Sequence, residues 1–314
     1  MSKIVVVGSA NTDMTIRSKK IPAPGETVVG GLFATAPGGK GANQAVAAAR
    51  AGGSVTFVAR VGDDSLGEEA IKGYQKEGID VSKIVRDPEA ATGVALIMVD
   101  ETGQNSISVA SGANFELSAE DVDSAADAIA AADVVVAQLE TPIPAIERAA
   151  KLAADANVPF ILDPAPAPAQ PLPPSLMSLV TIIKPNELEA TALTGKEVTD
   201  LASAQEAAQK LLDMGVQTAI VTLGSKGSVV FSKDGRHATF ASHKVKAVDA
   251  TAAGDVWIGA FAVAYAESKS EFDAAEFATA AAAVSVTRPG AQPSVPTREE
   301  IEAERKRAGT ESVE

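Results

Sequence analysis

Residues 3–13, KIVVVGSANTD, combine a short β-branched run with a polar cluster that follows it directly. The run KIVVVG has the composition of a buried strand that ends at a glycine. Similar runs recur along the chain, and Ala-rich segments of helical composition separate most of them. The strand-like runs are SVTFVARVG, GVALIMVD, DVVVAQLE, VPFILDPAPA, LVTIIKPN, TAIVTLGSKG and SVVFSKDG, and the helical segments are 41–51, 66–77, 119–131, 143–156, 202–214, 254–267 and 271–286.

This alternation predicts an α/β fold with a mainly parallel central sheet that helices cover on both faces. Ligands of such sheets gather at the carboxyl ends of the strands. Polar clusters follow several of the predicted strands at that end, namely GSANTD, QLETP, KPNELE and TLGSKG. We therefore expect the ligand site at this edge of the sheet.

Two segments depart from the alternation. Residues 14–37 have a strand-like pattern, and GVALIMVDETGQNSISVASGAN predicts two strands around a DETGQN turn. We expect residues 14–37 and 93–110 to form a small β-sheet lid, and residues 1–13, 38–92 and 111–314 to form the α/β domain. The C-terminal stretch TREEIEAERKRAGTESVE is charged and predicts a surface helix that frays into disorder.

Composition limits the possible classes of function. The 314 residues, 46% of them hydrophobic, suffice for one large α/β domain or two smaller ones. The formal charge of −14 argues against a nucleic-acid surface and against an anionic membrane. No apolar run approaches the roughly 20 residues of a membrane span. Because MSKIVVVG enters a strand at once, we expect no signal peptide and a cytoplasmic protein.

The chain contains no cysteine, which excludes a disulfide, a thiolate nucleophile and a cysteine metal site. The two histidines, His237 and His243, lie in a polar segment without the i, i+4 spacing of a helical metal site. A catalytic base in this chain would therefore be a carboxylate or a lysine.

Residues 36–53, APGGKGANQAVAAARAGG, place a glycine-rich turn before an Ala-rich helix. The turn lacks the GK[ST] spacing of a Walker A loop and does not form GxGxxG after a buried strand. It is either plain loop-to-helix geometry or a site for a hydroxyl-rich ligand. In the second case Lys40 and Asn43 would supply the donors, and the glycines would allow close contact.

Asn11 and Asp13 follow the first predicted strand, and Glu140 follows another. Such residues often only build turns. An amide and two carboxylates at the carboxyl edge of a sheet also suit bidentate recognition of sugar hydroxyls. These residues alone leave both interpretations open.

In KPNELEA, Asn186 and Glu189 are three residues apart on one face of a starting helix. They either cap that helix or order water around Mg²⁺, which binds few protein groups and keeps most of its waters. The Gly-x-x-Gly turn of TLGSKG, residues 222–227, is either an ordinary turn or a wrap around a nucleotide phosphate or ribose.

Residues 249–261, DATAAGDVWIGAF, place Ala252, Ala253 and Gly254 directly before Asp255 and a predicted helix. One capping side chain suffices for an ordinary helix start. Small residues instead let another group approach the backbone closely, and the N–H groups with the positive end of the helix dipole suit an anion. The pattern favours an anion site beside a reactive carboxylate.

Together these motifs resemble the PfkB carbohydrate kinases. The resemblance runs nearly from end to end through GSANTDM, PGETV, GGKGANQA, GDDSLGE, TGVALI, GAN, QLETP, DPAPA, KPNE, TLGSKG, AAGD and SVTRPGAQPSVPTREE. Within the family, GGKGANQA together with RPGAQPSVP is typical of the ribokinase branch. The resemblance implies a ribokinase-like three-layer α/β/α sandwich with a mainly parallel central sheet and a small β-sheet lid. It also implies ATP-dependent phosphorylation of D-ribose at O5 to D-ribose 5-phosphate.

The resemblance also assigns roles. Asp255 is implied as the catalytic base, and the N–H groups of Ala252, Ala253 and Gly254 as the anion hole for the transferred phosphoryl group. The implied sugar-binding residues are Asn11, Asp13, Gly39, Lys40, Asn43, Glu140 and Asp255. The implied ATP-binding residues are Asn186, Thr222, Gly224, Ser225, Gly227, Ala253, Gly254 and Thr279. Asn186 and Glu189 are implied to organise Mg²⁺ through water.

Ribokinases also hold a monovalent cation, usually K⁺, beside the anion hole. The implied ligands are Asp249, Ser294 and the carbonyls of Thr251, Ser285, Arg288 and Gly290. The β lid, which includes the PGET region, is implied to make the contact of a homodimer.

The sequence departs from the family pattern near these sites. Ala250 stands where Thr or Ser usually follows the cation-site Asp, and Val256 and Trp257 replace the usual Thr-Phe or Ser-Phe after the base. Thr279 stands where ribokinases often carry His or Asn. The changes bear on nucleotide and cation binding, whereas the implied base is intact.

Two alternative functions remain from the sequence. One is a related kinase for 2-deoxyribose, a ketohexose or a nucleoside. The other is a sugar-binding protein without turnover, against which the intact Asp255 and its anion hole argue.

Overall fold

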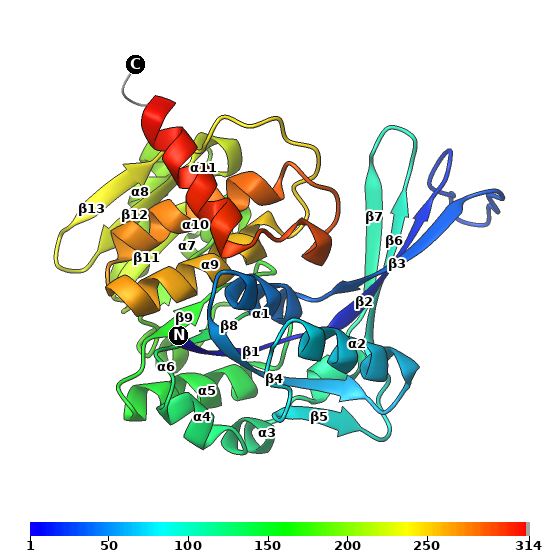
Figure 1. Cartoon of the computed structure of the whole chain (residues 1–314), viewed down its shortest axis with the longest axis horizontal. Coiled ribbons are helices and arrows are strands. Elements are labelled where there is room, and N and C mark those ends of the chain that lie inside the picture. Colours follow the sequence, from blue (N-terminus) through cyan, green and yellow to red (C-terminus); the bar gives the residue numbers. More distant parts are fainter. Residues whose placement is uncertain (312–314) are drawn as a thin grey trace.

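The computed structural model describes residues 1–311 and contains two separate β-sheets (Figure 1). The larger sheet has nine strands in the order β13-β12-β11-β10-β9-β8-β1-β4-β5. Its pairs from β11 to β5 are parallel, and β12 and β13 join antiparallel at one edge. The strands are β1 (Lys3–Val7), β4 (Ser54–Gly62), β5 (Ile84–Asp87), β8 (Val134–Ala137), β9 (Phe160–Leu162), β10 (Ile182–Ile183), β11 (Thr218–Thr222), β12 (Ser228–Ser232) and β13 (His237–Phe240).

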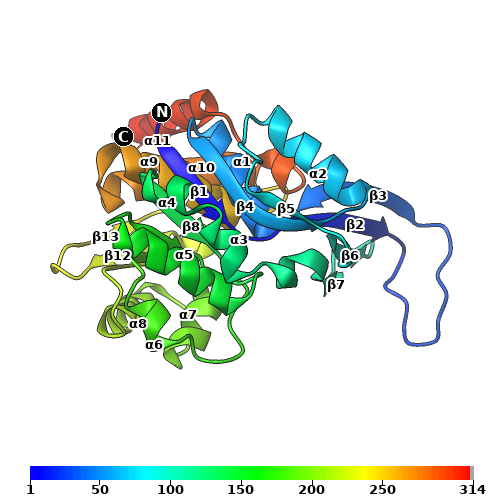
Figure 2. The same ribbon diagram turned by 90° about the horizontal axis from the view of Figure 1, so that it is seen from below.

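Helices cover both faces of this sheet (Figure 2). One layer contains α1 (Lys40–Arg50), α2 (Ser65–Lys76), α9 (Ala253–Ser268), α10 (Glu271–Ser285) and α11 (Arg298–Glu311). The opposite layer contains α3 (Ala119–Asp123), α4 (Ala126–Ala130), α5 (Ile143–Asp155), α6 (Pro174–Met177), α7 (Glu187–Thr194) and α8 (Leu201–Asp213). Two hydrophobic cores result, one between each helix layer and the sheet. The predicted three-layer α/β/α architecture is confirmed.

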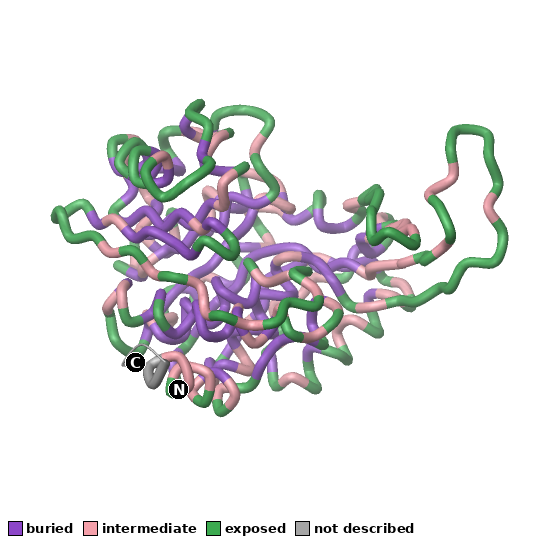
Figure 3. Tube along the Cα trace, turned by 90° about the horizontal axis from the view of Figure 1, so that it is seen from above, coloured by how far each residue is buried: buried purple, intermediate pink, exposed green. Residues whose placement is uncertain are grey.

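The smaller sheet has the strand order β3-β2-β6-β7 and projects from the body of the molecule (Figure 1). Its strands are β2 (Asn11–Arg17), β3 (Leu32–Gly38), β6 (Gly93–Val99) and β7 (Asn105–Ala110). The backbone trace is mainly buried in the body and largely exposed along this projection (Figure 3). Because β2 begins directly after β1, the small sheet starts at the carboxyl edge of the large one.

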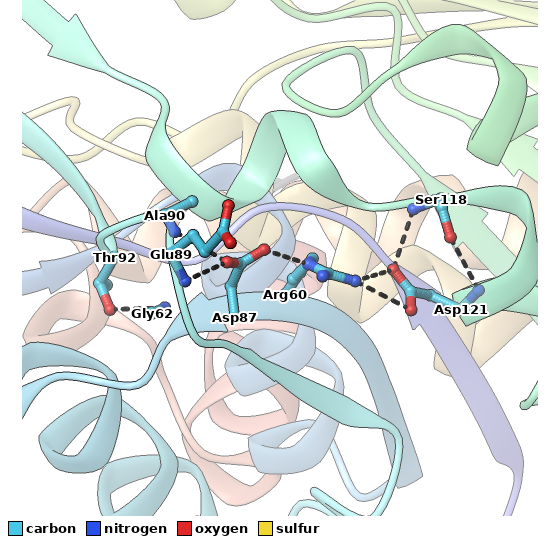
Figure 4. Close-up of polar contacts among 8 residues, drawn as sticks. All are labelled: Arg60, Gly62, Asp87, Glu89, Ala90, Thr92, Ser118 and Asp121. Carbon is cyan, nitrogen blue, oxygen red and sulfur yellow. Dashed lines mark hydrogen bonds and ion pairs between the residues drawn. The ribbon is translucent and has the colours of Figure 1, made fainter.

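An ion-pair bridge fixes the base of the smaller sheet (Figure 4). Arg60 in β4 donates to Asp87 at 2.7 Å and to Asp121 in α3 at 2.8 Å. Asp87 also accepts the amides of Ala90 and Glu89, and these amides with Arg60 lower the pKa of Asp87 to about 2. The bridge thereby holds the turn that leads from β5 into β6.

The structure differs from the predicted secondary structure in one helix and two strands. The predicted single helix over residues 119–131 is wrong, because α3 and α4 are separated at Ser124. The Ser124 hydroxyl donates to the Asp121 carbonyl, and the Ala125 amide donates to Val122 in a tighter turn, so the α-helical ladder stops. Strands β5 and β13 were missed because both are short edge strands. The C-terminal helix is confirmed as α11, and its predicted fraying beyond residue 311 lies outside the described residues.

Candidate active site

Helix α9 begins with a nearly bare N-terminus. Its N-cap, Ala252, has a left-handed backbone with φ of 58°, and no side chain caps the helix. The Ala253 amide donates to the Ala250 carbonyl at 3.2 Å, whereas within residues 1–311 we find no hydrogen bond to the amides of Gly254 and Asp255. This end of α9 borders a cavity of about 550 Å³. The two free amides and the helix dipole make it suitable for an anion.

The Asp255 carboxylate lies in the first turn of α9 and is only 6% exposed. Its Oδ2 accepts from Asn43 Nδ2 at 3.0 Å, and its Oδ1 accepts from Gln44 Nε2 at 3.1 Å. Burial raises the pKa of Asp255, while Lys40 and these two amides oppose the rise. Each carboxylate oxygen keeps a lone pair for a further donor.

Other side chains hold the two side-chain amides that contact Asp255. Gln44 Nε2 also donates to Asp163 at 2.8 Å, and its Oε1 accepts from Gln138 at 2.7 Å. Gln292 donates to Asn43 Oδ1 at 3.3 Å. Since a carboxylate only accepts hydrogen bonds, this arrangement presents the NH₂ side of each amide to Asp255. The orientation of Asp255 is therefore set by its surroundings.

A buried ion pair lies beside the start of α9. Lys184 Nζ is 3.0 Å from Asp163 Oδ1, and the two side chains are 3% and 2% exposed. A Cβ added at Gly254 would lie 3.5 Å from Lys184 Nζ. The ammonium group therefore adds a positive charge next to the free amides of α9.

Three predicted sugar-binding residues lie around the start of α1. Glu140 accepts from the Lys40 amide at 3.0 Å and from the Ser9 hydroxyl at 2.5 Å. Burial, with the charges of Glu140 and Asp255, raises the pKa of Asp13 to about 6. The nearby carboxylates Asp255, Asp163, Glu140 and Glu189 raise the pKa of Lys40 against the effect of burial, so Lys40 is charged.

Asn11 and two glycines complete this cluster. Asn11 Oδ1 accepts from Asn114 Nδ2 at 2.7 Å. Gly39 caps α1 with φ of 88°, and an added Cβ would lie 2.7 Å from the Asn11 amide. At Gly41 an added Cβ would lie 2.5 Å from the Ser9 amide. The glycine-rich turn is thus required for close packing of α1 against the end of β1.

The predicted nucleotide residues line the same cavity as the start of α9. These residues are Asn186, Thr222, Gly224, Ser225, Gly227 and Thr279. Asn186 and Glu189 form a reciprocal capping box at the start of α7, with contacts of 2.8 to 3.0 Å. Capping is therefore one role of this pair, and it leaves both side chains at the cavity surface.

Comparisons with known proteins identify the family of this chain. The model of the pfkB family of carbohydrate kinases matches residues 1–298. This chain belongs to the pfkB family of carbohydrate kinases. It is 46% identical to a ribokinase of Haemophilus influenzae, over 95% of this chain and 96% of that one. It is 36% identical to a deoxyribokinase of Salmonella typhi, over 95% and 97%.

A solved structure supports the fold of this kinase. The structure of Arabidopsis thaliana ribokinase complexed with ribose and ATP matches with a TM-score of 0.90 and 34% identity, over 98% of this chain and 99% of that one. The ribokinase-like fold with its separate smaller sheet is thereby confirmed. Among the described residues, no helix has the length and apolarity needed to cross a membrane.

The residues implied for cation binding lie in the loop before α9, at the end of α10 and in the loop after α10, and Asp249 joins the two loops. Its carboxylate accepts from the Thr251 amide at 2.9 Å, the Thr251 hydroxyl at 2.6 Å and the Gly290 amide at 2.8 Å. Ser285 and Ser294 are both buried and donate to carbonyls three residues earlier in the chain. The Arg288 side chain pairs with Glu300, which leaves only its carbonyl for the implied role.

Several residues of the candidate site received no role from their sequence pattern. Gln44 and Lys184 lie inside quoted motifs, beside residues that received roles, and Asp163 and Asn114 lie in DPAPA and GAN. Position in these motifs was the only available signal. Their contacts join segments that are far apart in the chain.

Proposed function

We propose that this kinase transfers the γ-phosphoryl group of ATP to O5 of D-ribose and produces D-ribose 5-phosphate. One observation carries the proposal: the oriented carboxylate of Asp255 lies between a polar cluster suited to sugar hydroxyls and the free amides of α9. The ribokinase relatives, and the ribose and ATP complex of the Arabidopsis thaliana protein, support ribose and ATP as the substrates.

The roles of the residues follow from their charges. Asp13, Asn11 and Glu140 would accept the ribose hydroxyls, and Lys40 and Asn43 would donate to them. Asp255 would take the proton of O5 as that oxygen attacks the γ-phosphorus. The amides of Gly254 and Asp255, with Lys184, would stabilise the negative charge on the transferred group. Because Ala253 is held by Ala250, its amide would join this anion hole only after a local shift.

The residues to which the family resemblance assigns cation binding suit two ions, Mg²⁺ and K⁺. Asn186 and Glu189 border the cavity and suit a Mg²⁺ ion bound mainly through water, which would neutralise phosphate charge. Among residues 1–311 no cluster of three acidic or histidine side chains offers a direct metal site. Asp249, Ser294 and the carbonyls of Thr251, Ser285, Arg288 and Gly290 would hold K⁺, because Asp249 already draws both loops together.

The assay that tests this proposal measures ADP release from MgATP and D-ribose with K⁺, and again with a large organic cation. We expect ribose-dependent release that K⁺ stimulates. Ribose-dependent release that is indifferent to K⁺ would retain the kinase and refute the cation site, with Ala250 as the suspected cause. No release with ribose would refute ribose as the substrate.

2-Deoxyribose is the second candidate substrate, since the Salmonella typhi relative is a deoxyribokinase. The two sugars differ by one hydroxyl. A site whose buried polar groups bind that hydroxyl rejects the analogue that lacks it, because those groups are then left unpaired. We expect kcat/KM for ribose to exceed that for 2-deoxyribose, and the reverse order would reassign the substrate.

Ribose affinity should depend on pH through Asp13. Its pKa is raised to about 6, so Asp13 is ionised above this pH and protonated below it. Since the ionised form accepts the ribose hydroxyls, the Kd for ribose should be constant above pH 7 and rise as pH falls, by about tenfold per unit below 6. Isothermal titration from pH 4.5 to 8 measures this. In Asp13→Asn the Kd should be higher and nearly independent of pH, and an unchanged pH profile would contradict the assignment.

We further propose that residues 14–37 and 93–110 form a lid over the sugar site, and that two copies associate through it. The small sheet exposes large apolar side chains on both faces, namely Ile16, Leu32, Phe33, Leu96, Ile107 and Val109. Exposed apolar patches of this kind mark protein interfaces.

Sedimentation of the protein tests the association. We expect a dimer for the wild type and a monomer for Phe33→Glu, since Phe33 is 64% exposed and a charge there opposes burial at an interface. Leu188→Glu is the matched control, because Leu188 is also a large apolar side chain, is 77% exposed and lies in α7, outside the smaller sheet. A wild-type monomer at micromolar concentration would refute the dimer.

A further inference from the structure

One wall of the nucleotide cavity is formed by a segment without backbone–backbone hydrogen bonds to its surroundings, residues 242–247 among those described. The segment between β13 and α9 places Ser242, His243, Val245 and Ala247 on the cavity. Across residues 242–247 we find no backbone–backbone hydrogen bond to another described residue. The conformation of this wall therefore depends on contacts made by side chains.

Helix α11 supplies such contacts. His243 Nδ1 lies 2.8 Å from Glu304 Oε1, and these side chains are 12% and 10% exposed. Arg307 donates to both carboxylate oxygens of Glu304, at 2.8 and 2.7 Å, and to the Lys244 carbonyl at 3.3 Å. Two residues of α11 thus hold consecutive residues of the wall.

The body of the protein in turn anchors α11. Ile301 is 1% exposed and belongs to the core shared with α9 and α10. Arg298 makes a bidentate ion pair with Glu267 of α9 at 2.7 and 2.8 Å. Figure 1 shows α11 lying against the α9 and α10 layer. Helix α11 is therefore fixed on the core, and through Glu304 it fixes His243 relative to that core.

We propose that α11 clamps the nucleobase end of the ATP site, with Glu304 and Arg307 as positioning residues for His243 and the wall behind it. The charged end of the cavity, with Lys184 and Gly254, suits the phosphates. The lining also includes the apolar side chains of Val245, Ala247, Ala282, Ala283 and Val286, which suit a flat base. The inference rests on the assignment of this cavity to ATP.

Nucleotide affinity can be measured without turnover. Trp257 is the single tryptophan of the chain and lines the cavity, so its fluorescence reports titration with ADP. In Glu304→Ala the Kd for ADP should rise roughly 5- to 10-fold, which corresponds to the usual contribution of one hydrogen bond. The KM for ATP should rise in parallel, while kcat and the KM for ribose stay within twofold.

Glu302→Ala is the matched control. Glu302 is on the same helix and pairs only weakly with Arg305, at 3.4 Å. Glu302→Ala also removes a carboxylate from α11, but it should leave the Kd for ADP unchanged because Glu302 does not contact the cavity wall. Equal effects of Glu302→Ala and Glu304→Ala on this Kd would overturn the inference.

A double-mutant cycle tests the route through His243. If Glu304 acts by holding His243, the effects of His243→Ala and Glu304→Ala on the Kd for ADP should be strongly non-additive. Additive effects, or an unchanged Kd in Glu304→Ala, would overturn the clamp and leave the kinase assignment intact. Failure of the wild type to bind ADP at all would instead refute the assignment of the cavity.

Discussion

Asp255→Asn should lower kcat by about 10²- to 10⁴-fold, the usual contribution of a general base. The mutant lacks the acceptor for the O5 proton. It also presents an NH₂ group to Asn43 or Gln44, which both donate to the native carboxylate. We expect the Kd for ribose to change by only a few fold, because the other sugar-binding groups remain. Single-turnover assays and ribose titration measure the two quantities.

Asp273→Asn is the control for this change. Asp273 also lies in the first turn of a helix, α10, but is exposed and outside the cavity. The kcat of the Asp273→Asn variant should equal that of the wild type. Near-normal turnover in Asp255→Asn would show that another group takes the proton, and equal loss in both variants would point to a structural effect.

Lys184→Met should destabilise the fold by about 3–5 kcal/mol, as removal of one partner of a buried ion pair usually does. Asp163 would keep the hydrogen bond from Gln44 but lose the ammonium that neutralises it. Turnover should fall as well, because Lys184 lies beside the free amides of α9. Urea unfolding and kcat together measure the result.

Asp163→Asn added to Lys184→Met separates these two effects. The double variant removes the stranded charge, so most of the stability should return while kcat stays low. Recovery of both would show that Lys184 serves only the fold. Lys196→Met is the surface control, because Lys196 and Glu206 are 54% and 65% exposed and such pairs contribute about 1 kcal/mol or less.

Most strands of the large sheet and most helices were predictable from the sequence because their signals are local. The run KIVVVG predicted β1, and Ala-rich segments predicted α1, α5, α8, α9 and α10 to within a few residues. The break at Ser124 was not predictable, since residues of good helix propensity continue on both sides of it. It arises from one hydroxyl that bonds to a backbone carbonyl.

The candidate site was only partly predictable for a related reason. Asp255, Lys40 and Asn43 carried signals in their motifs, and the structure brings them together. Gln44 received no role, because its function depends on Asp163, 119 residues away, and on Gln138, 94 residues away. Asn186 and Glu189 had two possible roles, and the structure shows the capping contact while the role in Mg²⁺ binding stays a proposal.

By itself the sequence determined the α/β alternation, the small residues before Asp255 and the absence of any cysteine. These depend on residue types and on spacing along the chain. Only the tertiary structure decided which amides hold Asp255, why the pKa of Asp13 is raised to about 6, and that α11 contacts a wall of the cavity through His243. Hydrogen-bond partners and desolvation depend on which distant segments meet, and local composition contains no information about that.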